Sequence, residues 1–143
     1  MRFIAPLLAS CLVAGPALAD THPFSIHDML AMDRISDPRV SPDGTRVAFT
    51  VRTTDLEANK GKNDLWLAAT EGGWARRITS HDASDTQARW SVDGKTIYFV
   101  STRSGSAQVW KLAVDGGEAE PVTRLPLDVD ALEVAPGGKS LLL

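Results

Sequence analysis

The chain has 143 residues, of which 43% are hydrophobic and 23% charged, and a formal net charge of −3. This composition is that of a globular protein and excludes a disordered or fibrous one. Because 15 Lys and Arg stand against 18 Asp and Glu, the charge balance argues against nucleic acid and anionic membrane surfaces as partners.

Residues 1–19 are predicted to be a signal peptide. Arg2 supplies a positive charge, Phe3 to Ala14 is an apolar run, and Ala17-Leu18-Ala19 has the small-x-small pattern that signal peptidase reads. The apolar run is shorter than the ~20 residues of a membrane-spanning helix. We therefore expect an exported protein, periplasmic or secreted, that leaves the membrane after cleavage. Lipidation of Cys11 is the alternative, but only ten residues precede it.

Residues 20–37 are predicted to form a linker with one short helix. Ser25 is a good N-cap residue, and Asp28 follows three positions later, as in a capping box. We expect the helix to run from Ile26 to about Met32. Its apolar stripe needs a surface to pack on.

An internal repeat decides the expected fold. At an offset of 44 residues, Asp64-Leu65-Trp66 aligns with Gln108-Val109-Trp110, and Ser91-Val92-Asp93-Gly94 aligns with Ala135-Pro136-Gly137-Gly138. An earlier copy, Ser41-Pro42-Asp43-Gly44, precedes the second one by 50 residues. A period of 40 to 50 residues is typical of the blades of a β-propeller.

The first repeat is longer than the second by six residues. Phe49 and Trp66 are 17 residues apart, whereas Phe99 and Trp110 are 11 residues apart. The additional residues therefore lie in the polar segment from Arg52 to Asn63.

Each repeat is predicted to form strands separated by turns. Asp43-Gly44 and Asp93-Gly94 predict two-residue hairpins with positive φ. Ile97 to Val100 is apolar on both faces, which fits a strand between packed blades. Trp66 and Trp110 are expected to pack between blades. The expected strands are Arg46–Val51, Asp64–Ala69, Arg76–Thr79, Thr96–Ser101, Gln108–Val114 and Pro121–Thr123.

The fold class that follows is all-β. We expect an incomplete β-propeller with blades of four antiparallel strands over residues 38–143, preceded by the signal peptide and the short helix. It holds about three repeats, the last one truncated. Since propellers close with four to eight blades, we expect this sequence to be the N-terminal part of a longer protein.

Few residues predict chemistry. No Gly-x-Ser-x-Gly nucleophile elbow occurs, and His22, His27 and His81 stand in no recognisable triad order. We therefore predict no catalytic residue, no cofactor-binding residue and no metal ligand in this sequence.

Three clusters resemble binding sites only superficially. His81-Asp82 with Asp85 is expected to be a solvated loop rather than a cation site. Asp128-Val129-Asp130 lacks the glycine of an EF-hand loop. Trp74-Ala75-Arg76-Arg77 is expected to be a solvated strand end rather than a nucleic-acid groove.

Two stretches, Pro23 to Leu30 and Asp33 to Phe49, resemble the amino-terminal opening of exported bacterial serine peptidases of the prolyl oligopeptidase family. Within that family, the sequence resembles the acylaminoacyl-peptidase and dipeptidyl-peptidase branches most. The resemblance covers Pro23 to Leu143. TolB-type propellers share the Ser-Pro-Asp-Gly turn, but the short helix followed by Ile35-Ser36-Asp37-Pro38 favours the peptidases.

This resemblance implies that substrate access and catalysis belong to two different domains. In that family a propeller of TolB-like blades covers an α/β-hydrolase domain and restricts the active site to short peptides, while the catalytic Ser, Asp and His come later in the chain. None of the three maps onto this sequence, so it is expected to be the substrate-gating part, inactive alone, with Ile26–Met32 packing against the hydrolase domain.

Two further points follow from the resemblance. Some dipeptidyl peptidases hold the substrate amine with propeller glutamates, but Glu118-Ala119-Glu120 is not an adjacent pair, so no site is transferred.

The alternative to the peptidase function is a non-catalytic, TolB-like periplasmic propeller that binds a protein partner.

Overall fold

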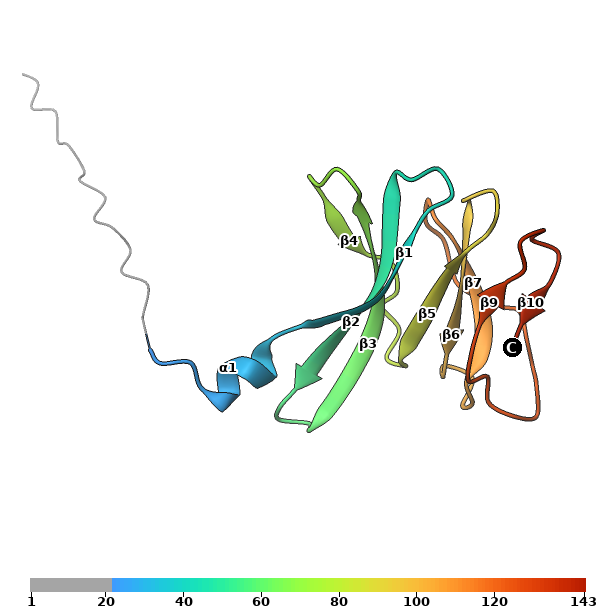
Figure 1. Ribbon diagram of the computed structural model, residues 1–143. Helices are drawn as coiled ribbons and strands as arrows, with labels where there is room; N and C mark the ends of the chain where they lie inside the picture. The colour runs from blue at the N-terminus through green and yellow to red at the C-terminus, as the bar shows by residue number, and fades with distance from the viewer. Residues whose placement is uncertain (1–21) are drawn as a thin grey trace, which may run out of the picture.

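The computed structural model describes residues 22–143, so the predicted signal peptide at residues 1–19 lies outside the described residues. A short helix is followed by three β-sheets that stand side by side like the leaves of a fan (Figure 1). Two sheets have four antiparallel strands, and the third is a two-stranded hairpin. The all-β architecture with four-stranded blades is confirmed, and within residues 22–143 the ring of blades is open.

The first blade is a meander whose strands lie in chain order. Its strands are β1 (Arg34–Val40), β2 (Arg46–Asp55), β3 (Lys60–Ala69) and β4 (Ala75–Arg77). Strand β1 begins inside the range 20–37 that we assigned to the linker, because Arg34 already pairs with Arg52. Pro38 lies in a β-bulge between Ser36 and Arg39, a place where a sheet tolerates proline.

The second blade repeats this arrangement and the third begins it. The strands are β5 (Asp85–Trp90), β6 (Thr96–Ser101), β7 (Gln108–Ala113), β8 (Glu120–Pro121), β9 (Glu133–Val134) and β10 (Leu141–Leu142). All six strands expected after the turns are present, although β4, β7 and β8 end earlier than expected. The strands that precede the turns, β1 and β5, were missing from the expectation.

The Ser-Pro-Asp-Gly turn is larger than the two-residue hairpin we predicted. The Ser41 N–H donates to the Arg46 carbonyl at 2.8 Å, so four residues lie between these two hydrogen-bonded residues. Gly44 has a positive φ of 74°, but Asp43 does not. The Asp43 carboxylate instead accepts hydrogen bonds from the Ser41 hydroxyl at 2.6 Å and the Thr45 N–H at 3.1 Å. This bonding explains why Ser and Asp recur together in both turns.

The additional residues of the first repeat lengthen one hairpin. In the second blade the β6–β7 ladder ends at Ser101. Strands β2 and β3 continue past the equivalent residue, Val51, for four further pairs, which end at Asp55 and Lys60. We call residues 52–63 the hairpin arm, which projects below the first blade in Figure 1.

Helix α1 (Ile26–Ala31) begins with the predicted capping box. The Ser25 hydroxyl accepts from the Asp28 N–H at 3.3 Å, and the Asp28 carboxylate accepts from the Ser25 N–H at 2.7 Å. The helix ends at Ala31, one residue earlier than expected, because Met32 is extended. None of its residues is buried. No helix within residues 22–143 is long and apolar enough to cross a membrane.

The core lies between the blades. One buried cluster joins the facing sides of the first two blades, and a second joins the second blade to the third hairpin. The first consists of Ala48, Leu65, Leu67, Ala88, Trp90, Ile97, Phe99, Leu112 and Val114, and the second of Val100, Val109, Val129 and Leu132. Strand β6 contributes to both clusters and is therefore buried on both faces, as its apolar sequence predicted.

The two equivalent tryptophans differ in environment. Trp110 packs against the cluster between the first two blades, as predicted. The prediction for Trp66 is wrong in the described structure, since it lines an apolar hollow with Phe49 and Ile35 on the outer face of the first blade. The physical reason is that no blade within residues 22–143 stands on that side.

Two leucines test whether packing between blades stabilises the fold. Leu67 is fully buried, whereas Leu127 is 76% exposed. We expect Leu67→Ala to lower the free energy of unfolding by about 2–5 kcal/mol, because it leaves a cavity between the blades. Leu127→Ala should change it by less than about 0.5 kcal/mol. Urea unfolding followed by tryptophan fluorescence measures both, and equal effects would contradict the assignment of the core.

Candidate functional site

The first strands of the blades are those along which neighbouring blades converge. Strand β5 contacts both β1 and β9, whereas β4 and β8 do not contact each other within residues 22–143. Blades that converge along their first strands surround a central space when further blades continue the ring. We call β1, β5 and β9 the inner strands. The candidate site is the group of charged side chains that links them, the inner cluster: Asp37, Arg39, Arg89 and Glu133.

Arg89 is the centre of the inner cluster. Its side chain is only 10% exposed, with Nη1 donating to Asp37 Oδ2 at 2.7 Å and Nε donating to Glu133 Oε1 at 3.0 Å. Arg39 donates to Asp37 Oδ1 at 3.0 Å and lies 3.6 Å from Glu133 Oε1. Arg39, Arg89 and Glu133 occupy equivalent positions in the three repeats. The cluster therefore connects three consecutive blades through side chains alone.

A β-bulge explains how side chains of one inner strand reach the next blade. Asp37 and Gln87 occupy equivalent positions in β1 and β5, and both have a left-handed backbone, with φ of 48° and 56°. Asp37 reaches Arg89 in the next blade. Gln87 accepts from the Leu132 N–H at 3.0 Å and donates to the Asp130 carbonyl at 2.8 Å, which ties the second blade to the third. The bulge re-aims one side chain per blade toward its neighbour.

Two buried carboxylates lie where the first blade meets the second. Asp85 Oδ2 accepts from Arg103 Nη2 at 2.8 Å, and Asp64 Oδ1 lies 3.3 Å from Arg77 Nη2 and 3.8 Å from Lys62 Nζ. The Oδ1 atom of each carboxylate has no hydrogen-bond donor among the described residues. Burial raises the pKa of Asp64 although Arg77 and Lys62 oppose the rise, and the Asp85 carboxylate adds to it.

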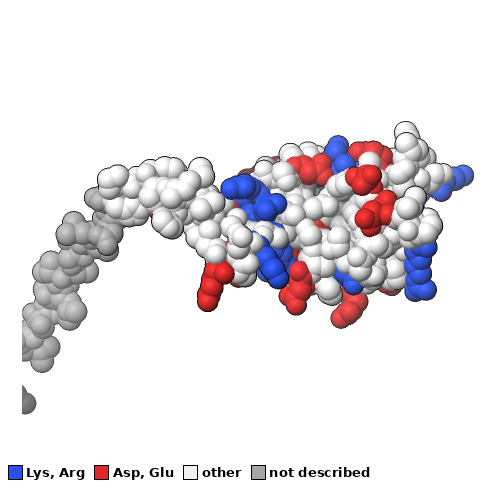
Figure 2. All heavy atoms as spheres, turned by 90° about the horizontal axis from the view of Figure 1, so that it is seen from below, with Lys and Arg blue, Asp and Glu red and all other residues white. Residues whose placement is uncertain are grey.

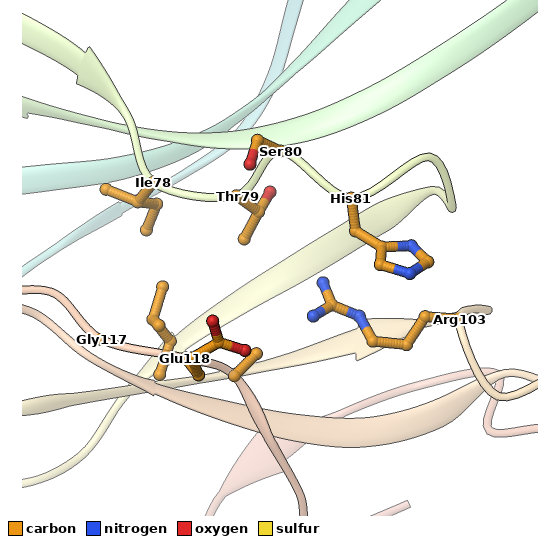
Figure 3. A pocket seen from close by; sticks show the side chains of 9 residues that line it. Ile78, Thr79, Ser80, His81, Arg103, Gly117 and Glu118 are labelled. Carbon is orange, nitrogen blue, oxygen red and sulfur yellow. The ribbon is translucent and has the colours of Figure 1, made fainter.

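A cavity of about 230 Å³ lies between the segment after β4 and the second blade. Figure 3 shows His81 above the Arg103 guanidinium, with Glu118 on the same wall as Arg103. The guanidinium also lies over the Phe99 and Trp110 rings, 5.2 Å and 5.0 Å from their centroids. Because it is already paired with Asp85, Arg103 fixes the loop after β6 to the start of β5.

The structure separates the histidines that the sequence contains. His22 lies 3.5 Å from Asp28 before the helix, and His81 Nδ1 accepts from the Ala83 N–H at 3.0 Å in a loop. Asp85 pairs with Arg103 and not with His81. Among residues 22–143, no group of three or more His, Cys, Asp or Glu is arranged to hold a metal ion.

The remaining clusters named from the sequence contribute to structure. Asp128 accepts from the Ala107 N–H at 2.7 Å, and Glu120 pairs with Lys111 at 3.0 Å. The segment expected to be only a solvated strand end does more, because Arg76 donates to the Val114 carbonyl of the second blade at 2.7 Å. Its neighbour Arg77 pairs with Asp64.

Arg89 and Arg39 form a matched pair for testing the inner cluster. Arg89→Ala leaves two carboxylates without their most buried partner, so we expect a loss of about 2 kcal/mol in the free energy of unfolding. Arg39→Ala removes a half-exposed partner and should cost less than about 1 kcal/mol. Denaturant unfolding of both variants compares them. A larger loss for Arg39→Ala would contradict the central position of Arg89.

Asp64 and Asp43 should influence stability in opposite directions as pH changes. The raised pKa of Asp64 stabilises the fold only at low pH, and this contribution is lost as pH rises through the folded pKa. Hydrogen bonds from Ser41 and Thr45 lower the pKa of Asp43 to about 2, so its contribution is present at neutral pH and is lost as pH falls.

Two asparagine variants test this difference. Relative to the unmodified protein, Asp64→Asn should be at least as stable at pH 7 and lose that advantage toward pH 4. Asp43→Asn should be less stable at pH 7, with the gap narrowing as the pH falls from 4 toward 2. Thermal unfolding across this pH range measures both gaps, and parallel pH profiles for the two variants would contradict the opposite signs.

Comparison with known proteins relates the chain to propellers of peptidases and of TolB. The uncharacterized peptidase YuxL of Bacillus subtilis is 33% identical over 117 residues, which make up 81% of this chain and 18% of YuxL. The acylaminoacyl peptidase of Pyrococcus horikoshii has a TM-score of 0.64 and 28% identity, covering 79% of this chain and 17% of that one. The putative TolB of Agrobacterium tumefaciens has a TM-score of 0.60 and 26% identity, covering 74% and 37%.

This chain thus spans less than a fifth of the length of the two peptidases, and the part it matches is their propeller region. The model of the family described as TolB beta propeller domain matches residues 31–143. That match includes both complete blades and the hairpin that begins the third. The chain therefore belongs to the TolB beta propeller domain family.

Proposed function

We propose that the chain is the propeller of an exported serine peptidase of the prolyl oligopeptidase family and controls which peptides reach the catalytic site. The observation that carries this proposal is the similarity to peptidases over about four fifths of the chain. The resemblance of Pro23 to Phe49 to the opening of such enzymes supports it. So does the predicted signal peptide, which supports export.

The reaction itself belongs to a separate catalytic domain in this proposal. There a serine activated by a neighbouring base attacks the peptide carbonyl, and backbone N–H groups stabilise the oxyanion. The sequence contains no Gly-x-Ser-x-Gly element, and we assign none of its residues to bond cleavage. The contribution of this chain is to limit access, because a ring of closely packed blades excludes folded proteins.

The inner strands are the surface that an entering peptide would meet. Arg89 is largely buried and satisfied by its two carboxylates, whereas the side chains of Arg39 and Glu133 are 42% and 57% exposed. These two side chains place one positive and one negative group beside the central space. Such a pair suits contact with the backbone and termini of short peptides more than selection of a single side chain.

The intact polypeptide tests the proposal. We expect it to react with a fluorophosphonate probe, to hydrolyse short chromogenic peptides with free or acylated amino termini, and to leave casein largely uncut. Residues 22–143 alone should neither react with the probe nor cleave peptides. Failure of the intact polypeptide to react and to cleave would overturn the proposal.

The similarity to TolB supports one second candidate, a non-catalytic periplasmic propeller that binds a protein partner. The same experiment separates the two functions, because this candidate predicts no probe labelling and no hydrolysis by the intact polypeptide.

A further inference from the structure

The cavity of about 230 Å³ between the segment after β4 and the second blade combines opposite charges with an apolar wall. We call it the interblade cavity. The described residues that line it include none from the inner strands, so it is separate from the central space. Pockets for drug-sized ligands measure about 300–1,000 Å³, so this cavity suits a smaller molecule.

Arg103 presents a free donor to the interblade cavity. Its Nη2 donates to Asp85 Oδ2 at 2.8 Å, and its Nε donates to Ser101 Oγ at 2.9 Å. Among residues 22–143, its Nη1 has no hydrogen-bond acceptor. The guanidinium is held in place because it also lies over the Phe99 and Trp110 rings. A positive group with free N–H bonds is therefore fixed at the wall of the cavity.

His81 provides a second donor from the opposite wall. Its Nδ1 accepts from the Ala83 N–H at 3.0 Å, so the hydrogen of the neutral ring is on Nε2. Figure 3 shows the ring above the Arg103 guanidinium. A carboxylate placed between these two side chains would accept hydrogen bonds from both, and those from a guanidinium are among the strong ones.

Glu118 supplies the opposite charge. Its side chain forms no ion pair and no hydrogen bond within the described part of the chain, whereas the nearby Glu120 pairs with Lys111 at 3.0 Å. Figure 3 shows the Glu118 carboxylate reaching into the cavity, apart from the Arg103 guanidinium. A positive and a negative group thus face the same small space without neutralising each other.

The rest of the lining is mainly apolar. Ile78 and Ala119 pack against the buried cluster between the first two blades, and Leu112 is part of that cluster. A short aliphatic group that enters the cavity is therefore removed from water.

The combination of charges favours a ligand that carries both signs. An anion alone would lie near the Glu118 carboxylate, and a cation alone would lie near the Arg103 guanidinium. Figure 2 shows acidic and basic side chains interspersed over the blades, so on that face no large field of one sign attracts a purely anionic or cationic ligand.

We propose that the interblade cavity binds a free α-amino acid with a small aliphatic side chain. Arg103 and His81 donate to its carboxylate, Glu118 binds its ammonium group, and the apolar wall holds its side chain. The inference goes beyond the proposed function, because the site lies outside the central space and needs no catalytic domain. A bound amino acid would join the segment between β4 and β5 to the second blade.

Three ligands of one carbon skeleton test the need for both charges. L-Valine carries both, isovalerate lacks the amine, and isobutylamine lacks the carboxylate. Isothermal titration calorimetry on the intact polypeptide measures the affinity for each. We expect L-valine to bind at least about tenfold more tightly than either of the others, because each of them loses a charged hydrogen bond.

Glu118 and Glu120 form a matched pair of variants for locating the ligand. Both are exposed, but only Glu118 lines the interblade cavity. Glu118→Gln should raise the Kd of L-valine by about tenfold, and Glu120→Gln should leave it unchanged. His81→Ala should raise it by about fivefold, because one hydrogen bond is lost. Thermal unfolding without ligand checks that each variant is folded.

The outcomes separate this inference from the proposed function. Equal affinity of Glu118→Gln and Glu120→Gln for L-valine would place the ligand elsewhere and overturn the site. Equal affinity for isovalerate or isobutylamine would overturn the requirement for both charges, and absence of binding at millimolar L-valine would overturn the ligand. An intact polypeptide without peptidase activity overturns only the proposed function, because the binding measurement does not depend on catalysis.

Discussion

The structure depends on one constraint, that an apolar face of a blade needs a neighbouring blade to cover it. Within a blade the backbone hydrogen bonds form between adjacent strands, so the sheet satisfies its polar groups alone. Its apolar side chains leave water only when a neighbouring blade packs against them. Phe99 and Val100, adjacent on β6, therefore enter two different clusters, one shared with each neighbouring blade. Stability then comes from interfaces between repeats, as in other repeat proteins.

The inner cluster adds something that apolar packing does not provide. Apolar faces are tolerant of small rotations, whereas Arg89 holds Asp37 and Glu133 at fixed distances on either side. Charged contacts of this kind contribute more to the choice of one arrangement than to the total free energy of folding. The inner cluster thus holds consecutive inner strands at a defined separation, through the contacts of Arg89 with Asp37 at 2.7 Å and with Glu133 at 3.0 Å.

Much of the fold could be predicted from the sequence because its signals are local. The Ser-Pro-Asp-Gly turn and the apolar strands after it depend on residues close together in the chain. Strand β1 escaped prediction because Pro38 sits in a bulge that only the paired strand reveals. The outer position of Trp66 likewise depends on which blades are neighbours and not on its own repeat.

The inner cluster could not be found by comparing repeats for identical residues. Its equivalent positions carry Arg39, Arg89 and Glu133, and the bulge carries Asp37 or Gln87. These residues differ in type because each one contacts another blade, so that an arginine in one repeat faces a carboxylate in another. The sequence does carry a signal for the cluster. In the first two repeats a polar residue stands two positions before an arginine, and in the third repeat the position of the arginine is taken by the acidic residue Glu133.

Each four-stranded blade is built from one uninterrupted stretch of the chain, and this affects how it can fold during synthesis. All four strands of the first blade come from residues 34–77, so its hydrogen bonds can form as soon as that stretch has left the ribosome. Contacts so near in sequence close with little loss of chain entropy. Each new blade then folds against a completed one, and the growing end exposes a single apolar face at a time.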